Sequence, residues 1–255
     1  MKELSDPEKL RYHRHLILDE IGEAGQVRIR NARFLVVGAG GLGCPVIQYL
    51  TAAGAGVIGI MDNDTVEISN LQRQVFYGFN DIGKLKSIVA STRMKRLNSF
   101  VDIVMINRWL NAQNALEIIA EYDVIVDCTD NLKSRYLIND AAIIRNKPMV
   151  HGAVHKYQGQ VSVFNYQNGP SYRCLHPQSS TENPETPGEL GIFSVLPGII
   201  GLLQVNEALK VVTGAGEVLS GKLMIYNALN SQFVLVDIEK NPDNFITKNL
   251  ITKFS

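Results

Sequence analysis

This sequence predicts an α/β fold: a Rossmann-like, mostly parallel sheet with helices on both faces, extended by antiparallel strands in its C-terminal part. Up to about residue 150, short apolar runs alternate with helix-like segments, which is typical of parallel βαβ units. From about Gly159, apolar residues recur at every second position, as in antiparallel strands with one exposed face. With 255 residues, 45% of them hydrophobic, we expect one domain over 1–255, comprising an N-terminal helical segment (1–30), a parallel part (31–150) and an antiparallel part (151–240).

A glycine-rich turn lies inside the first βαβ unit. Phe34–Val37 and Val57–Met61 are apolar runs typical of buried strands, and Cys44–Ala53 between them is helix-like. The turn has the pattern G-x-G-x-x-G with a fourth glycine inside it, namely Gly38, Gly40, Gly41 and Gly43. Such glycines let the backbone approach a phosphate, and the helix N-terminus offers it free N–H groups. Asp62 follows the second strand, where these folds bind a ribose hydroxyl, so we expect a nucleotide site in 31–150.

Basic and amide residues after this unit favour a nucleoside triphosphate over a dinucleotide. Asn70, Gln72, Arg73 and Gln74 follow the ribose acid closely, and Lys86 comes soon after. An enzyme that transfers a phosphoryl or nucleotidyl group needs cations on the β and γ phosphates. An NAD-dependent oxidoreductase has no special use for them, but it remains the alternative interpretation.

The run that begins at Tyr122 is expected to be a central parallel strand. Its carboxyl end carries Asp127, Asp130 and Asn131. Because ligands bind beyond the carboxyl ends of parallel strands, we expect these three residues to face the same crevice as the glycine turn. Asp130 or Asn131 should cap the helix expected at 132–145, which leaves a carboxylate for Mg²⁺.

Other elements follow from periodicity. Helical spacing marks 8–30 and 81–97, and short strands are expected at Val101–Ile106 and Met149–His151. Later strands are indicated by alternating residues: Val161, Val163, Tyr166, Leu223, Ile225, Tyr226, Phe233, Leu235 and Val236.

Three segments of the C-terminal third have distinct compositions. Residues 177–191 are rich in Pro, Ser, Thr, Glu and Gly, so we expect a long mobile loop. Val195–Val212 is apolar on nearly all sides, so this helix should be buried in the fold or at a subunit interface. The polar tail from Asn241 is expected to fray.

Charge and cysteine content exclude several classes of protein. Lys plus Arg equals Asp plus Glu at 25 each, so no basic field indicates nucleic acid or a membrane surface. The polar N-terminus, Met1–Pro7, does not resemble a signal peptide. Three cysteines (Cys44, Cys128 and Cys174) fit a reducing cytoplasm.

Five separate motifs, over about residues 8–238, resemble the HesA/MoeB/ThiF family, the bacterial ubiquitin-activating-enzyme-like adenylyltransferases. These motifs are Arg11-Tyr12-His13-Arg14, the turn Gly38–Gly43, Asn70-Leu71-Gln72-Arg73-Gln74, Asp127-Cys128-Thr129-Asp130-Asn131 and Tyr172-Arg173-Cys174. The resemblance implies a cytoplasmic homodimer that uses ATP and Mg²⁺. Its substrate would be the C-terminal glycine of a ubiquitin-like sulfur carrier ending in Gly-Gly, MoaD-like for molybdopterin or ThiS-like for thiamine thiazole synthesis.

The resemblance also implies roles for particular residues. Arg73 and Lys86 would stabilise the leaving pyrophosphate, Asp130 would bind Mg²⁺, and Arg14 would reach into the partner subunit's site. The implied nucleotide contacts are Gly38, Gly40, Gly41, Gly43, Asp62, Asp64, Ser69, Asn70, Leu71, Gln72, Arg73, Gln74, Lys86, Asp130 and Asn131.

This sequence departs from the family pattern in its cysteines. Many members hold structural zinc with two C-x-x-C pairs, but here the first pair is Ser171-Tyr172-Arg173-Cys174 and no cysteine follows it, so we expect no zinc. Pro187 stands where some members carry a loop cysteine, and Cys44 and Cys128 are expected to be packing residues. No second domain of the rhodanese type is expected, so sulfur should come from a separate donor protein. A catalytically silent homologue that only binds the carrier, and a relative acting on a tRNA base, are further alternatives.

Overall fold

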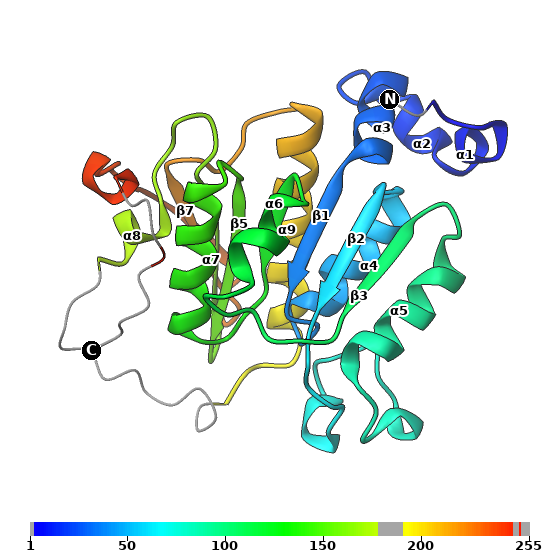
Figure 1. The fold of residues 1–255 in the computed structure, drawn as a ribbon, viewed down its shortest axis with the longest axis horizontal. Helices are drawn as coiled ribbons and strands as arrows, with labels where there is room; N and C mark the ends of the chain where they lie inside the picture. The colour runs from blue at the N-terminus through cyan, green and yellow to red at the C-terminus, as the bar shows by residue number, and fades with distance from the viewer. Residues whose placement is uncertain (1–2, 178–190, 247–249, 251–255) are drawn as a thin grey trace.

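The structure is a computed structural model, and it describes residues 3–177, 191–246 and 250. Within these residues eight strands form one sheet in the order β3-β2-β1-β4-β5-β6-β7-β8 (Figure 1). The strands are β1 (Arg33–Val37), β2 (Val57–Met61), β3 (Asp102–Ile106), β4 (Val124–Asp127), β5 (Met149–His155), β6 (Gln158–Phe164), β7 (Lys222–Asn227) and β8 (Gln232–Asp237). The α-helices are α1 (Asp6–Arg11), α2 (His13–Leu16), α3 (Gly22–Asn31), α4 (Gly43–Ala53), α5 (Lys86–Leu97), α6 (Ala115–Ala120), α7 (Leu132–Ile144), α8 (Tyr172–Leu175) and α9 (Leu196–Thr213). Three 3₁₀ turns are η1 (Ile68–Asn70), η2 (Phe79–Asp81) and η3 (Pro242–Phe245).

The sheet is parallel in one half and antiparallel in the other, which confirms the fold class expected from the sequence. Strands β3, β2, β1, β4 and β5 pair in parallel, whereas β5 through β8 pair antiparallel. The first βαβ unit has the expected bounds to within one residue. Strand β4 is central, because β1 and β5 flank it.

Helices cover both faces of the parallel half, so its strands contribute to two apolar cores. Phe34 and Val36 of β1 point into the core shared with α4, α5 and α9. The alternate residues Leu35 and Val37 point into the core shared with α6 and α7. Because neighbouring residues of a strand face opposite sides, a strand buried on both sides must be apolar at every buried position, as β1 is from Phe34 to Val37.

Several element boundaries differ from the sequence-based expectation. Residues 8–30 form parts of three helices, because Tyr12 separates α1 from α2 and residues 17–21 separate α2 from α3. Helix α5 begins at Lys86 instead of residue 81, since Gly83 adopts a left-handed φ of 82° that ends η2. Strand β5 extends four residues past His151, because its pairing with β6 continues to His155 beyond the end of its pairing with β4.

Three expectations concern the C-terminal third. The expected loop at 177–191 lies almost entirely outside the described residues. Helix α9 is buried in the fold along one side, where it packs on α4, β5 and β6. Asn241–Ile246 does not fray as expected: η3 is capped by the Asn241 side chain, which accepts a hydrogen bond from the Asp243 N–H.

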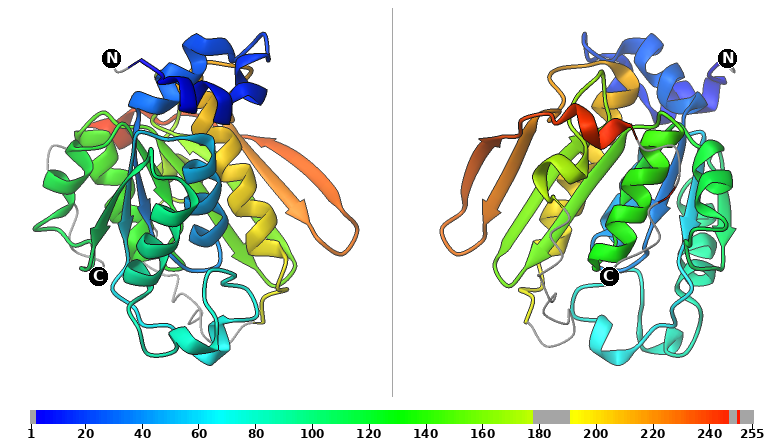
Figure 2. Two further views of the ribbon diagram at one scale, coloured as in Figure 1. Left: turned by 90° about the vertical axis from the view of Figure 1, so that its right-hand side faces the viewer. Right: turned by 60° about the vertical axis from the view of Figure 1, so that its left-hand side comes forward.

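The β7–β8 hairpin extends away from the rest of the molecule (Figure 2). Every residue of β8 is exposed, including four apolar ones: Phe233, Val234, Leu235 and Val236. Since consecutive strand residues face opposite sides, both faces of β8 are uncovered by the described part of the chain. None of the described helices combines the length and apolar composition needed to cross a membrane.

Candidate functional site

The glycine turn between β1 and α4 needs glycine for two distinct reasons. Gly38 has a φ of 99°, and a Cβ there would lie 2.7 Å from the Cys128 carbonyl oxygen; a Cβ on Gly43 would lie 2.0 Å from the Gly38 carbonyl oxygen. These two glycines therefore let the turn pass close to the end of β4. Gly40 and Gly41 are less confined, and their N–H groups form no backbone hydrogen bond with the described residues. Those free donors beside the start of α4 suit an anion.

Asp62 lies next to this turn, directly after β2. Its Oδ2 accepts a hydrogen bond from the Ala39 N–H at 2.7 Å, and its Oδ1 accepts one from the Asp64 N–H at 2.8 Å. Burial raises the pKa of this carboxyl, while the two hydrogen bonds oppose that shift. Each oxygen keeps a free lone pair, so Asp62 can still accept hydrogen bonds from a ribose.

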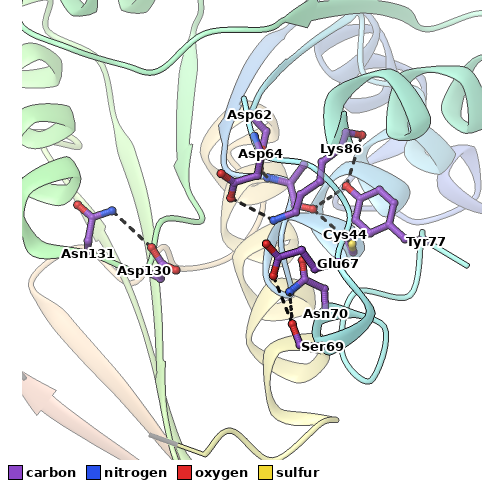
Figure 3. Close-up of polar contacts among 11 residues, drawn as sticks. Cys44, Asp62, Asp64, Glu67, Ser69, Asn70, Tyr77, Lys86, Asp130 and Asn131 are labelled. Atoms are coloured by element: carbon purple, nitrogen blue, oxygen red, sulfur yellow. Dashed lines mark hydrogen bonds and ion pairs between the residues drawn. The ribbon is translucent and has the colours of Figure 1, made fainter. Parts of the chain in front are cut away.

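Asp64 forms an ion pair with a buried lysine. Lys86 is the first residue of α5, and its Nζ lies 3.1 Å from Oδ2 of Asp64, which is itself exposed (Figure 3). Tyr77 donates its hydroxyl proton to the Ala39 carbonyl oxygen at 2.8 Å and lies 3.5 Å from the Lys86 carbonyl oxygen. Tyr77 therefore joins the glycine turn to the start of α5. Sequence reasoning missed it, because one tyrosine in a loop gives no local signal.

Asn70 and Gln74 bring two unpaired acceptors to the site. Both side chains are buried, yet Asn70 Oδ1 and Gln74 Oε1 have no hydrogen-bond partner within the described residues. A buried acceptor without a donor costs about 1–3 kcal/mol, which indicates that a ligand or a water supplies the missing donor.

The other residues of this segment take different positions. Arg73 is half-buried, and its Nη1 donates to the Ser69 carbonyl oxygen at 3.2 Å. Ser69 is exposed and donates to Glu67 at 3.4 Å. Leu71 packs against the apolar core, and Gln72 is exposed.

At the end of β4, Asn131 and Asp130 behave differently. Asn131 caps α7, because its Oδ1 accepts a hydrogen bond from the Ser134 N–H at 2.9 Å, as one of these two residues was expected to do. The Asp130 carboxylate is exposed, and the Asn131 amide at 3.4 Å is its hydrogen-bond partner among the described residues. An exposed carboxylate with one weak hydrogen bond, at the carboxyl end of β4, fits Mg²⁺, which prefers one or two carboxylates together with phosphate oxygens.

The expectation that Asp127 faces the same crevice was wrong. Asp127 is the last residue of β4, and its side chain is fully buried. Its Oδ1 accepts hydrogen bonds from the Thr129 N–H and hydroxyl, and its Oδ2 accepts one from His151 Nδ1 at 2.9 Å. Burial lowers the pKa of His151, so the neutral ring donates from Nδ1 to Asp127. Asp127 thus holds the turn that leads to Asp130 instead of facing a ligand.

Arg14 lies far from the other candidate residues of its own chain. It is an exposed residue of α2, and Tyr12, just before this helix, packs against Gly54 and accepts a hydrogen bond from Asn98 Nδ2 at 2.8 Å. Gly54 and Asn98 precede β2 and β3, so α2 lies at the amino ends of these strands. Figure 1 shows α1–α3 at that end and the segment after β2 at the other. The five residues of β2, about 16 Å long, separate the two ends.

Cys44 and Cys128 do not belong to this site as nucleophiles. Cys44 and Cys128 are buried, as expected for packing residues. Burial raises the pKa of the Cys44 thiol to about 12 and raises that of Cys128 well above its usual value. Their thiolates are therefore not available near neutral pH.

Comparison with known proteins identifies relatives over nearly the whole chain. The sequence profile described as the ThiF family matches residues 12–246. The chain is 46% identical to the sulfur carrier protein adenylyltransferase of Thermus thermophilus over 243 residues, covering 91% of this chain and 88% of that protein. It is 48% identical to a probable molybdopterin-synthase adenylyltransferase of Porphyra purpurea, covering 89% of this chain and 60% of that protein. It is 44% identical to the adenylyltransferase and sulfurtransferase MOCS3 of Xenopus laevis, covering 90% of this chain but only 51% of that protein.

Solved structures of low sequence identity share the fold. Escherichia coli MccB with MccA-N7isoASN has a TM-score of 0.82 at 21% identity, over 94% of this chain and 74% of that one. MccB with ATP has a TM-score of 0.74 at 22% identity, over 86% of this chain and 67% of that one.

Proposed function

The chain belongs to the ThiF family, and we infer that it is an ATP-dependent adenylyltransferase that activates the C-terminal glycine of a ubiquitin-like sulfur carrier protein. One observation in the structure favours this over a dinucleotide enzyme. The Gly40 and Gly41 N–H groups form no backbone hydrogen bond with the described residues, and near this turn lies a buried lysine, Lys86, whose counter-charge is the exposed Asp64 carboxylate. Such a cation can turn toward a triphosphate, while a nicotinamide dinucleotide offers it no role.

The proposed reaction needs positioning and positive charge more than it needs a base. The carrier's terminal carboxylate is already ionised, so it attacks the α-phosphate of ATP without a general base, and pyrophosphate leaves. Lys86 and Arg73 would stabilise charge on that leaving group, and Asp62 would hold the ribose. Asn70 and Gln74 would each accept a hydrogen bond from the bound nucleotide, which satisfies their buried oxygens.

Magnesium fits the same arrangement. Asp130 would hold Mg²⁺, which neutralises phosphate charge when it is bound. Asn131 beside it is committed to capping α7, so it keeps the turn in place instead of serving as a ligand. The buried Asp127 supports the same turn through Thr129.

Arg14 enters the proposal as a residue that acts across a homodimer. Its position at the amino ends of the strands supports action in a partner's site, since about 16 Å of sheet separates it from its own glycine turn. We further propose a cytoplasmic enzyme with a separate sulfur donor. The chain spans about half the length of the relatives named adenylyltransferase and sulfurtransferase.

Carrier-dependent exchange of labelled pyrophosphate into ATP tests the proposed reaction. Purified chain with Mg²⁺, ATP and a MoaD-like or ThiS-like carrier should catalyse exchange. The same carrier without its last glycine should not support it, because the attacking carboxylate is then displaced. If neither carrier supports exchange while the chain binds NAD tightly, the oxidoreductase alternative is favoured.

A further inference from the structure

Three N–H donors and one hydroxyl meet at one sulfur atom, Cys174 Sγ, away from the proposed nucleotide site. Two come from Ser171, whose N–H and hydroxyl each lie 3.4 Å from the sulfur. The other two come from the segment after β8: the Asn241 N–H lies at 3.3 Å and the Asn244 amide nitrogen at 3.4 Å. Cys174 also lies 3.9 Å from the Asn241 carbonyl oxygen. One sulfur therefore joins two segments about 70 residues apart.

The spacing of these residues is that of a zinc site, but their chemistry is not. Ser171 and Cys174 are three residues apart, as are Asn241 and Asn244, and two pairs with this spacing around one centre describe a double C-x-x-C site. Only one of the four residues carries a thiol. Ser171 contributes its N–H and hydroxyl, Asn244 its side-chain amide and Asn241 its backbone N–H. The donor hydrogens of Ser171, Asn241 and Asn244 point toward the centre, where they would repel a cation. Within the described residues no group of three or more His, Cys, Asp or Glu side chains could hold a metal ion.

We propose that Cys174 and the donors around it form a hydrogen-bonded clasp that takes the place of a structural metal and fastens the C-terminal segment to α8. The arrangement inverts a zinc site: instead of a cation surrounded by anionic sulfurs, one sulfur is surrounded by donors. This proposal is independent of the adenylation reaction.

The pKa of the Cys174 thiol is shifted in the direction that strengthens such a clasp. Burial opposes ionisation of Cys174, but hydrogen bonds from the Ser171 hydroxyl, the Asn241 N–H and the Asn244 amide outweigh it and lower the pKa of the thiol. A thiolate accepts these bonds more strongly than a neutral thiol, because charge-assisted hydrogen bonds are about twice as strong.

The clasp is anchored in the body of the fold. Arg173, next to Cys174, forms two hydrogen bonds to Asp140 of α7, at 2.8 and 2.7 Å, and these side chains are buried. The Tyr172 N–H donates to Asn139 of α7 at 2.8 Å. On the other side, the Lys240 ammonium lies 4.4 Å from the centre of the Phe245 ring. The clasp therefore links the end of β8 to α7 through α8.

Two substitutions at neighbouring positions test whether the loss of a hydrogen bond to Cys174, and not a change of charge alone, lowers the stability. Asn244→Asp replaces a donor with a carboxylate 3.4 Å from the sulfur, so Tm should fall by about 4 °C or more. The same change should raise the pH at which Cys174 becomes reactive to iodoacetamide; Cys44 and Cys128 are buried, so they should not contribute. The control Asp243→Asn alters the adjacent exposed residue of η3 and should change neither quantity. Equal behaviour of the two variants would overturn the proposal.

Metal content provides the second test. Elemental analysis of untagged wild-type protein should find far less than one zinc per chain, and a chelator should not lower Tm. The triple variant Ser171→Cys, Asn241→Cys, Asn244→Cys should instead bind about one zinc, and Co²⁺ should give the spectrum of a tetrahedral thiolate site. Stoichiometric zinc in the wild type with a chelator-sensitive Tm would refute the clasp, as would a folded triple variant that binds no metal.

Discussion

Mixing two inactive variants tests whether each active site is shared between two chains. Arg14→Ala and Asp130→Ala both change exposed side chains, so each should leave the free energy of unfolding within about 0.5 kcal/mol of the wild type. Each should lower pyrophosphate exchange by about 10²-fold or more, because each removes a group proposed to stabilise transferred charge. Arg14 lies at the amino ends of the strands and Asp130 at the carboxyl end of β4, so one site should take these groups from different chains.

The expected recovery follows from the geometry. Random exchange of equal amounts gives about half heterodimers. In each heterodimer one site lacks both groups, while the other has Asp130 from the Arg14→Ala chain and Arg14 from the Asp130→Ala chain. About a quarter of wild-type exchange activity should therefore return.

The matched control mixes Asp130→Ala with Lys86→Ala. Both residues lie at the carboxyl edge of the same chain's sheet, so every site of the heterodimer keeps one defect and activity should stay near that of the separate variants. Native mass spectrometry confirms that subunits have exchanged. If heterodimers form and the Arg14 and Asp130 mixture still stays inactive, the shared-site hypothesis is wrong.

Three further expectations concern the glycine turn, Lys86 and a buried histidine. In urea denaturation, Gly43→Ala should lower the free energy of unfolding by about 3 kcal/mol or more, because its Cβ would lie 2.0 Å from the Gly38 carbonyl oxygen. The control Gly40→Ala should change the free energy of unfolding by less than about 1 kcal/mol, because its Cβ would lie 3.5 Å from the Gln74 side chain. Lys86→Met should lower the maximal rate of exchange by about 10²-fold or more, and its exposed neighbour Lys84→Met should retain activity; equal rates would contradict the role of Lys86. Burial lowers the pKa of His176 to about 4 from 6.5, so the folded state binds this proton more weakly than the unfolded state. The free energy of unfolding should therefore fall by about 1–3 kcal/mol as pH drops from 6.5 to 4, and His176→Gln, but not the exposed His13→Gln, should flatten that slope.

Local sequence patterns were sufficient to predict the parallel half of the fold. The predictions that were wrong concern residues whose positions depend on contacts with distant parts of the chain. The apolar runs of β1, β2 and β4 and the glycine turn could be predicted, because burial on both faces and close backbone contact each require particular residue types. The orientation of Asp127 could not, since it depends on His151, 24 residues away. The same holds for the partners of Cys174, which come from a segment about 70 residues later.

Burial of the amide side chains was also beyond sequence reasoning. Asn70 and Gln74 are polar residues in a loop, where exposure is the usual expectation. They are buried because the segment after β2 folds back over the glycine turn, where Tyr77 reaches Ala39, 38 residues earlier. The sequence identified these residues as candidates, but their unsatisfied oxygens became visible only in three dimensions.

The projecting β7–β8 hairpin should make this chain prone to aggregate in a cell. An outermost strand with apolar side chains on both faces is a template for pairing with other unfolded or partly folded chains. A protein that binds this strand prevents such pairing. Because it binds the folded state, it also stabilises that state by mass action. The yield of this chain in a recombinant host should therefore rise when a protein that binds this strand is co-expressed.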